Sequence, residues 1–98
     1  MNQRARQGET ARLAIGEALR HADRSRCEGR LIEAEAICRK ILQVRADLPE
    51  AEHLLGIIAH QGGKVGEALA HVQRATQLAP QVALFHANLG EMCRLAGR

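Results

Sequence analysis

Aromatic side chains are almost missing from this 98-residue sequence, which contains one phenylalanine, Phe85, and no tryptophan or tyrosine. Sheet proteins rely on aromatic and β-branched residues in their strands, and proteins that bind single-stranded nucleic acid stack bases on aromatic rings. Hydrophobic residues still make up 46% of the chain, so any core must be built from Leu, Ile, Val and Ala. Such a core favours close packing of helices.

Cysteine pairs at metal-binding or redox spacing are also absent. Cys27, Cys38 and Cys93 are odd in number and far apart, and no CxxC motif occurs. A zinc knuckle and a dithiol redox centre are therefore excluded, and we interpret the cysteines as reduced thiols. No apolar run approaches the roughly 18 residues of a membrane span, and residues 1–10 lack the apolar region of a signal peptide. We expect a soluble cytoplasmic protein with no membrane partner.

The positive charge is small and mixed with negative charge. The net charge is +3, and charged residues make up 26% of the chain. Nucleic-acid binding needs basic residues gathered on one face. Acidic residues interrupt the arginines of the first third, which favours a solvated helix face over a nucleic-acid partner. The arginines are Arg4, Arg6, Arg12, Arg20, Arg24, Arg26 and Arg30, and the interrupting acids are Glu9, Glu17, Asp23 and Glu28.

Catalytic signatures are missing as well. The sequence has no Ser-His-Asp arrangement, phosphate-binding glycine loop or nucleotide fingerprint. The carboxylate pairs Glu33/Glu35 and Glu50/Glu52 are two residues apart, so on helices they face different ways, and we interpret them as solvated or helix-start charges. Cys38 is predicted to be a small core residue. We therefore expect no catalytic residue, no cofactor, no metal and no enzyme activity.

What the sequence does contain is an internal repeat. Leu55-Gly56 aligns with Leu89-Gly90, and Glu33-Ala34 aligns with Glu67-Ala68. The offset is the same in both cases, and a fixed period of about 34 residues is typical of stacked structural repeats. Three glycines also align at this period, and each is followed by a basic residue: Gly29-Arg30, Gly63-Lys64 and Gly97-Arg98.

Each period has the spacing of a helical hairpin. Apolar residues recur at three- and four-residue steps on either side of Gly62-Gly63, which predicts two helices joined by a glycine turn. Glycine suits such a turn because a helix often ends on a left-handed residue. Asp47, with Pro49 and Glu50 after it, is predicted to cap the next helix. No alternation of period two predicts a strand, so we expect an all-α protein.

The pattern of Leu55, Gly56, Gly63, Ala68 and Pro80, together with Ala75, resembles the tetratricopeptide repeat family. The resemblance implies an α-α superhelix of stacked antiparallel hairpins, here five helices in about two and a half repeats. Its usual aromatic residues are missing, and His21, Ala22 and Ser25 depart from it in the first unit. The stretches EAEAICRKIL and EAEHLLGIIAHQGG also look similar to repeats at the front of some bacterial glycosyltransferases and sulfotransferases.

We divide the chain accordingly as one domain, residues 1–98. Residues 1–14 form a polar extension or the start of the first helix, and residues 15–48 form a degenerate first repeat. Residues 49–82 form the second repeat, and residues 83–98 are the first helix of an incomplete third.

In this family the first helix of each hairpin lines a concave groove. We therefore predict non-catalytic binding of a peptide or partner helix there. His53 and His60 are seven residues apart and point the same way, and without a third ligand they are expected to form hydrogen bonds in the groove. His71 is expected on the surface. The predicted groove comprises Leu19, Asp23, Arg26, His53, Ile57, His60, Ala87, Asn88, Glu91 and Arg94.

The last helix raises a second expectation. A covering helix after it is not encoded in these 98 residues, so the chain is either a fragment of a longer array or pairs with another copy of itself. A homodimer would bury Leu84, Phe85, Leu89 and Met92, with Cys93 also uncovered. The alternative function is that of a substrate-selecting N-terminal part of a larger glycosyltransferase or sulfotransferase.

Overall fold

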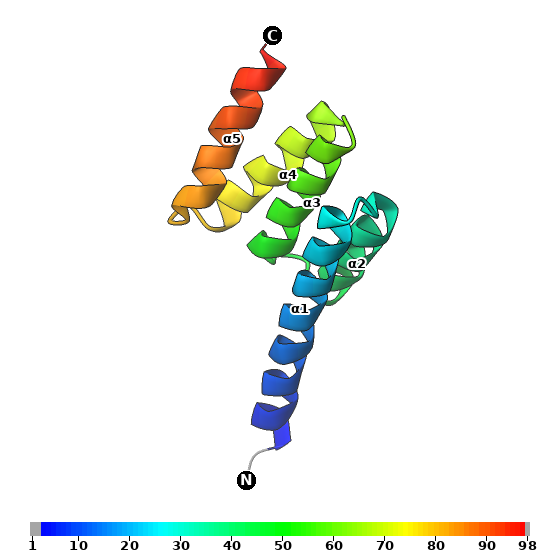
Figure 1. Ribbon diagram of the computed structural model, residues 1–98. Helices are drawn as coiled ribbons and strands as arrows, with labels where there is room; N and C mark the ends of the chain where they lie inside the picture. The colour runs from blue at the N-terminus through cyan, green and yellow to red at the C-terminus, as the bar shows by residue number, and fades with distance from the viewer. Residues whose placement is uncertain (1–2, 98) are drawn as a thin grey trace.

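The computed structural model describes residues 3–97, with side chains described for residue 8 and residues 10–97. Over this range the chain forms five α-helices and no strand (Figure 1). The side chains of Arg4, Arg6 and Glu9, and residue Arg98, lie outside the described residues. Successive helices pack in antiparallel pairs, so the predicted all-α superhelix of stacked hairpins is confirmed. The helices are α1 (Gln3–Cys27), α2 (Leu31–Val44), α3 (Pro49–Gln61), α4 (Val65–Leu78) and α5 (Ala83–Ala96).

The helices recur at the interval seen in the sequence. The starts of α2 and α4 are one repeat period apart, and so are the starts of α3 and α5 and the ends of α1 and α3. Residues 3–14 belong to α1, so the helix begins well before the first repeat that the sequence delimits. At its N-terminal end α1 projects away from the other helices (Figure 1).

The turns within the two hairpins share one geometry. Gly29 and Gly63 have φ angles of 82° and 78°, the left-handed region that favours glycine. Gly97 occupies the same place in the period but has φ of −72° and is right-handed. In both turns the N–H after the glycine donates to the carbonyl five residues earlier, which satisfies a free carbonyl at the end of the helix. These bonds are Arg30 to Ser25 and Lys64 to Ala59, both 2.8 Å.

The start of α3 differs from the prediction. Leu48, with φ −85° and ψ 108°, is the N-cap, and no side chain caps the helix. Asp47 is therefore wrong as a cap, because it lies one residue too early. Leu48 is 8% exposed and packs in the core, so this position serves hydrophobic packing and leaves the first N–H groups without a side-chain acceptor. Pro49 does occupy the first turn, as expected.

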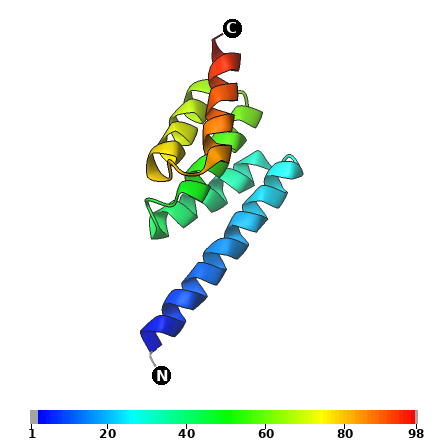
Figure 2. The same cartoon turned by 90° about the vertical axis from the view of Figure 1, so that its left-hand side faces the viewer.

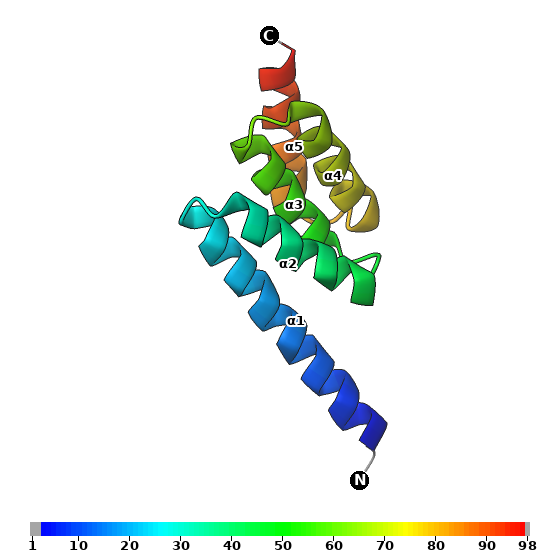
Figure 3. The ribbon, with the colours of Figure 1, turned by 90° about the vertical axis from the view of Figure 1, so that its right-hand side faces the viewer.

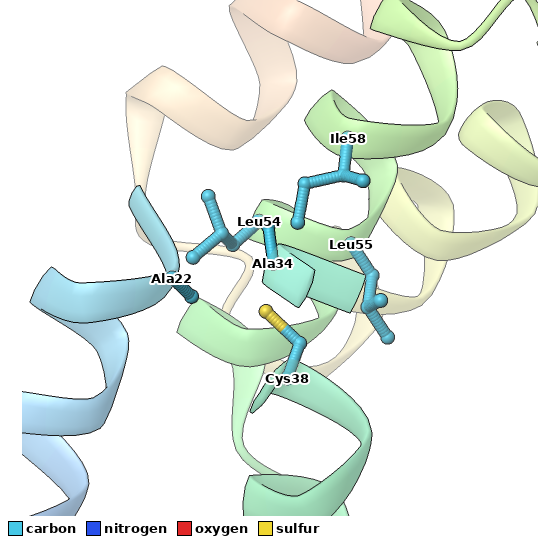
Figure 4. Close-up of a cluster of buried hydrophobic side chains, with 6 residues drawn as sticks. All are labelled: Ala22, Ala34, Cys38, Leu54, Leu55 and Ile58. Carbon is cyan, nitrogen blue, oxygen red and sulfur yellow. The ribbon is translucent and has the colours of Figure 1, made fainter. Parts of the chain in front are cut away.

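Buried side chains form small clusters that join neighbouring helices, as expected of a repeat stack. The largest fills the space between α1, α2 and α3 and contains Cys38, which is buried as predicted (Figure 4). A second cluster joins α3, α4 and α5 around Val72. The first contains Ala22, Ala34, Cys38, Leu54, Leu55 and Ile58, and the second contains Ala59, Ala68, Val72 and Met92.

Small residues set the closest approach of paired helices. A Cβ placed on Gly56 would overlap the Cγ2 atom of Val72, so only glycine fits where α3 meets α4. At the equivalent position of the first hairpin, Ala22 packs in the same cluster as Cys38. One hairpin therefore combines glycine with valine and the other alanine with cysteine, which keeps the local volume similar.

The odd-numbered helices lie side by side. In Figure 2, α5 crosses in front of α3 and α4, and in Figure 3, from the opposite side, it lies behind them. Hydrogen bonds link α1 to α3 and α3 to α5 directly, at Arg26–Gln61 and His53–Asn88. We call the surface made by these helices the α1/α3/α5 face, and the opposite surface the α2/α4 face.

Candidate partner-binding face

Six of the predicted groove residues occupy two equivalent positions on the three odd-numbered helices. Because the helices recur at the repeat period, each position appears once on α1, α3 and α5. One position is acidic on the outer helices and apolar on α3, and the other is basic on the outer helices with a histidine between. The first consists of Asp23, Ile57 and Glu91, and the second of Arg26, His60 and Arg94.

On α1 the guanidinium of Arg26 is fixed from two sides. Its Nε and Nη2 donate to Oδ1 of Asp23, at 3.0 and 2.8 Å. Its Nη1 donates to Oε1 of Gln61 on α3, at 2.9 Å. Gln61 returns a longer bond of 3.4 Å to the Arg26 carbonyl. The Arg26 side chain, 22% exposed, is thus held in one orientation before any partner arrives.

On α5 the pairing of arginine with the acidic residue three positions earlier recurs. Arg94 Nε donates to Oε2 of Glu91 at 3.0 Å. This hydrogen bond lowers the pKa of the Glu91 carboxyl and raises the pKa of Arg94, and the charge of His60 also lowers the pKa of Glu91. Both side chains are exposed, so they remain available to a partner.

His53 lies beneath this surface, contrary to its predicted place in the groove. It is 8% exposed, and burial lowers the pKa of its imidazole. Asn88 Nδ2 donates to His53 Nε2 at 2.7 Å, and the ring lies 4.5 Å from that of Phe85, tilted by 31°. His53 forms a hydrogen bond, as expected, but it does so beneath α5 and not in an open groove, because α5 covers the ring. Its hydrogen bond instead fixes α5 against α3.

The other predicted groove residues contribute unequally. Leu19 is half-buried and packs against the clusters between α1, α2 and α3. Ala87 is exposed, and Asn88 is half-buried with its amide engaged by His53. The surface open to a partner is therefore made chiefly by the residues at the two equivalent positions described above, which we call the two rows of this face.

We expected the apolar side chains of α5 to be uncovered, and this is wrong for two of them. Phe85 and Met92 are 5% and 6% exposed, because α3 and α4 already cover them. Leu84 is 58% exposed and Leu89 is half-buried, and Cys93 is exposed as expected. The apolar surface left for pairing of two copies is correspondingly smaller.

The sequence analysis missed a hydrogen-bonded contact between Glu52 on α3 and His71 on α4. Glu52, interpreted as a solvated charge, is 8% exposed, and its Oε2 lies 2.8 Å from Nδ1 of His71. Arg74 Nε lies 3.9 Å from the other carboxylate oxygen. The available signal was the position of Glu52 between Ala51 and Leu54, on a helix that neighbours cover from both sides. His71, expected on the surface, is half-buried beside this carboxylate.

Among the described residues, no three His, Cys, Asp or Glu side chains are grouped so that they could hold a metal ion. Over the same part of the chain, no helix combines the length and the apolar character needed to span a membrane.

Among the comparisons with known proteins, those with solved structures give a match. No protein-family model matches the chain, and no curated protein matches it. Among the solved structures that match is a mutant of the O-GlcNAc transferase of Thermobaculum terrenum, with 34% identity and a TM-score of 0.78. The match covers 84% of this chain and 16% of that chain, so the likeness concerns a small part of the larger enzyme. It supports a tetratricopeptide-like helical repeat.

Proposed function

We propose that the α1/α3/α5 face binds an extended segment of a partner protein, without catalysis. The observation that carries this proposal is the repetition of one acid–arginine pair on α1 and α5, each pair joined by two hydrogen bonds. Side chains fixed before binding lose little conformational entropy when a partner arrives. A helical-repeat fold provides an extended surface of this kind.

The two rows also indicate what kind of segment fits. A chain crossing from α1 to α5 meets charged pairs at both ends and Ile57 with His60 between them. Ile57 is half-buried and offers an apolar contact. We propose a segment with an apolar side chain at its centre and hydrogen-bonding groups on either side, since Arg26 and Arg94 can each bind an additional carboxylate or carbonyl.

The test starts with a partner identified by affinity capture from the source cell and confirmed with purified components. The variant Arg26→Gln with Arg94→Gln removes both guanidinium groups of the face. Lys40→Gln with Arg45→Gln removes the same charge from exposed positions on and after α2 and serves as the matched control. We expect the first variant to weaken binding about tenfold or more in calorimetry, which corresponds to roughly 1.4 kcal/mol. Equal weakening by both variants would show that the face is not the site.

A second candidate function is supported by the likeness to an O-GlcNAc transferase. The chain would then be the substrate-selecting front part of a larger bacterial glycosyltransferase or sulfotransferase, and the same face would hold the protein substrate. The coding sequence downstream of Arg98 distinguishes the two functions. A long continuation with a transferase fold supports this candidate, whereas a few further helices followed by a stop codon support the free-standing module.

Self-association through α5 stays a prediction, with Leu84 and Leu89 as its remaining apolar surface. Light scattering during size-exclusion chromatography over a dilution series measures it. A dimer that Leu84→Glu dissociates would support pairing through α5, and a monomer at the highest concentration would contradict it.

A further inference from the structure

The α2/α4 face contains a pocket that the groove proposal does not use. It lies where the turn after α3 meets α2 and α4, and its volume is about 160 Å³. Its walls are mainly apolar, and one histidine, His71, reaches it from α4. The apolar lining consists of Leu31, Ile32, Leu55, Ile58, Ala59 and Gly62.

The size of the pocket suits one aromatic ring. An apolar cavity of about 150 Å³ in another protein holds one benzene molecule. Ile32 at the rim is 86% exposed, so a side chain bound in the pocket would also cover part of its apolar surface. The pocket thus has the dimensions and the lining of an anchor site for one side chain.

The polar groups of the pocket have a defined arrangement. Glu52 holds Nδ1 of His71 at 2.8 Å, and because a carboxylate only accepts hydrogen bonds, Nδ1 carries the proton. Nε2 is thus the ring nitrogen left for a ligand in the pocket, and a phenolic hydroxyl, which both donates and accepts, can hydrogen-bond to it. At the rim Arg39 is paired with Glu35 at 2.9 Å, and Lys64 and Glu67 add one charge of each sign, so the rim has no excess of either sign.

We propose that this pocket binds the side chain of a tyrosine on a partner protein. The ring fills the apolar volume, and the phenolic hydroxyl forms a hydrogen bond with Nε2 of His71, so that both the apolar body and the polar tip are satisfied. A neutral side chain fits the balanced rim. The occupant does not come from a second copy of this chain, because the sequence has no tyrosine or tryptophan and Phe85 is 5% exposed.

The experiment titrates the ¹⁵N-labelled protein with N-acetyl-tyrosine amide and, separately, with N-acetyl-phenylalanine amide, following amide shifts by NMR. We expect saturable shifts confined to the pocket lining, with the tyrosine amide bound about fivefold more tightly, the worth of one hydrogen bond of about 1 kcal/mol. Equal affinity for the two amides, or no saturable shift at the pocket, would overturn the proposal.

Two glycine variants form a matched pair. Gly62 has φ −81°, and a Cβ there meets nothing closer than 3.6 Å, so Gly62→Leu places a side chain in the pocket without backbone strain. Gly66 has open space around it and does not line the pocket, so Gly66→Leu is the control. We expect the first to abolish tyrosine amide binding and the second to preserve it. Binding that survives Gly62→Leu in a folded protein would place the site elsewhere.

His71→Asn provides the chemical readout. The shorter amide can bond to Glu52 but cannot reach the pocket as well, so we expect the preference for tyrosine over phenylalanine to disappear while binding of the phenylalanine amide persists. A preference that remains would contradict the role of His71. This variant also decides the question if Gly62→Leu fails to fold, and a dimer that dissociates in Gly62→Leu would overturn the proposal by assigning the pocket to a second copy.

Discussion

His53 shows how a polar residue on the predicted binding helix becomes part of the scaffold. Its ring is covered by Phe85, and its Nε2 accepts from Asn88, so the site between α3 and α5 favours the neutral imidazole, and burial lowers its pKa. A charged ring there would lose water on one side and the hydrogen bond from Asn88 on the other. His53 therefore contributes stability only in its neutral form.

The lowered pKa of His53 predicts a pH dependence of stability. Above the ordinary value of 6.5 the ring is neutral in both states, and its contribution is fully present. As the pH falls below that value the unfolded state binds the proton first, so the free energy of unfolding decreases until the folded-state pKa is reached. We expect urea denaturation to show a larger loss between about pH 7.5 and about pH 5 for the wild type than for His53→Gln. Equal losses would contradict this role for His53.

The three thiols should differ in reactivity. Burial raises the pKa of Cys38 to about 12, whereas Cys27 and Cys93 are exposed. Because the thiolate is the reactive form, we expect an aromatic disulfide reagent to modify two thiols quickly and the third only in denaturant. Cys38→Ala should retain both fast reactions and lose the slow one. Three equal rates in the native protein would show that the cluster around Cys38 opens freely.

At this scale the sequence predicted the buried position of Cys38 but not those of His53 and Glu52. Apolar periodicity places a small residue such as Cys38 on a buried stripe. A buried polar residue depends on a partner from a distant helix, such as Asn88 or His71, and periodicity within one helix carries no information about that partner.

Successive hairpins meet at two joints, α2 with α3 and α4 with α5. The two joints lie at equivalent positions of the repeat, but they differ in which helix contributes the large side chain. The joint of α2 with α3 places large Ile41 and Leu48 against Ala51. The joint of α4 with α5, one repeat period later, places small Ala75 against large Phe85. The large side chain has therefore moved from one side of the joint to the other, and each joint is filled by a different matched pair.

This matching predicts a compensating pair of substitutions. Ile41→Ala alone should cost about 2–5 kcal/mol through the cavity it leaves, and Ala51→Phe alone about 1–3 kcal/mol through overpacking. The double variant reproduces the pattern of the second joint. We expect a favourable interaction energy of about 0.5–3 kcal/mol in a double-mutant cycle measured by urea denaturation. Strict additivity would mean that the two side chains do not share one space.

The helices and their interval could be predicted from the sequence, because glycine turns and regular repeat spacing are local signals. The start of α3 could not be predicted to the residue. Asp47 and Leu48 both precede Pro49, and the choice between a polar cap and a buried leucine is made by the hydrophobic space beneath α3. That space exists only once α2 has packed.

In the whole molecule, stability should be distributed unevenly along the stack. The helix α3 packs against α1, α2 and α4, and most of its residues are buried. The N-terminal part of α1 projects beyond the other helices (Figure 1), and the side chains of residues 10–14 are exposed. In repeat proteins each unit is stabilised by its neighbours, so the middle unit is protected from both sides.

Hydrogen exchange measures this distribution. We expect the amides of α3 to exchange most slowly, those of α4 next, and those of the projecting end of α1 most rapidly, because local opening follows the density of buried contacts. A uniform exchange rate in all five helices would show that the described chain opens as one cooperative unit instead.

The fold class was predictable at this scale because repetition is visible in the sequence. The roles of the two faces were not. Which residues remain open on the α1/α3/α5 face depends on how far α5 covers its neighbours, and the pocket of the α2/α4 face arises from residues on three helices.

The unequal joints also determine the order in which the hairpins can be assembled. Removing residues 49–82 would place two large side chains, Ile41 and Phe85, at a single joint and overpack it. Duplicating the same segment would place two small side chains, Ala75 and Ala51, at a new joint and leave a cavity there. The hairpins of this protein are therefore not interchangeable. Each one packs well only against the hairpin that follows it in the sequence, and a gene with the repeats reordered would encode helices that do not pack together.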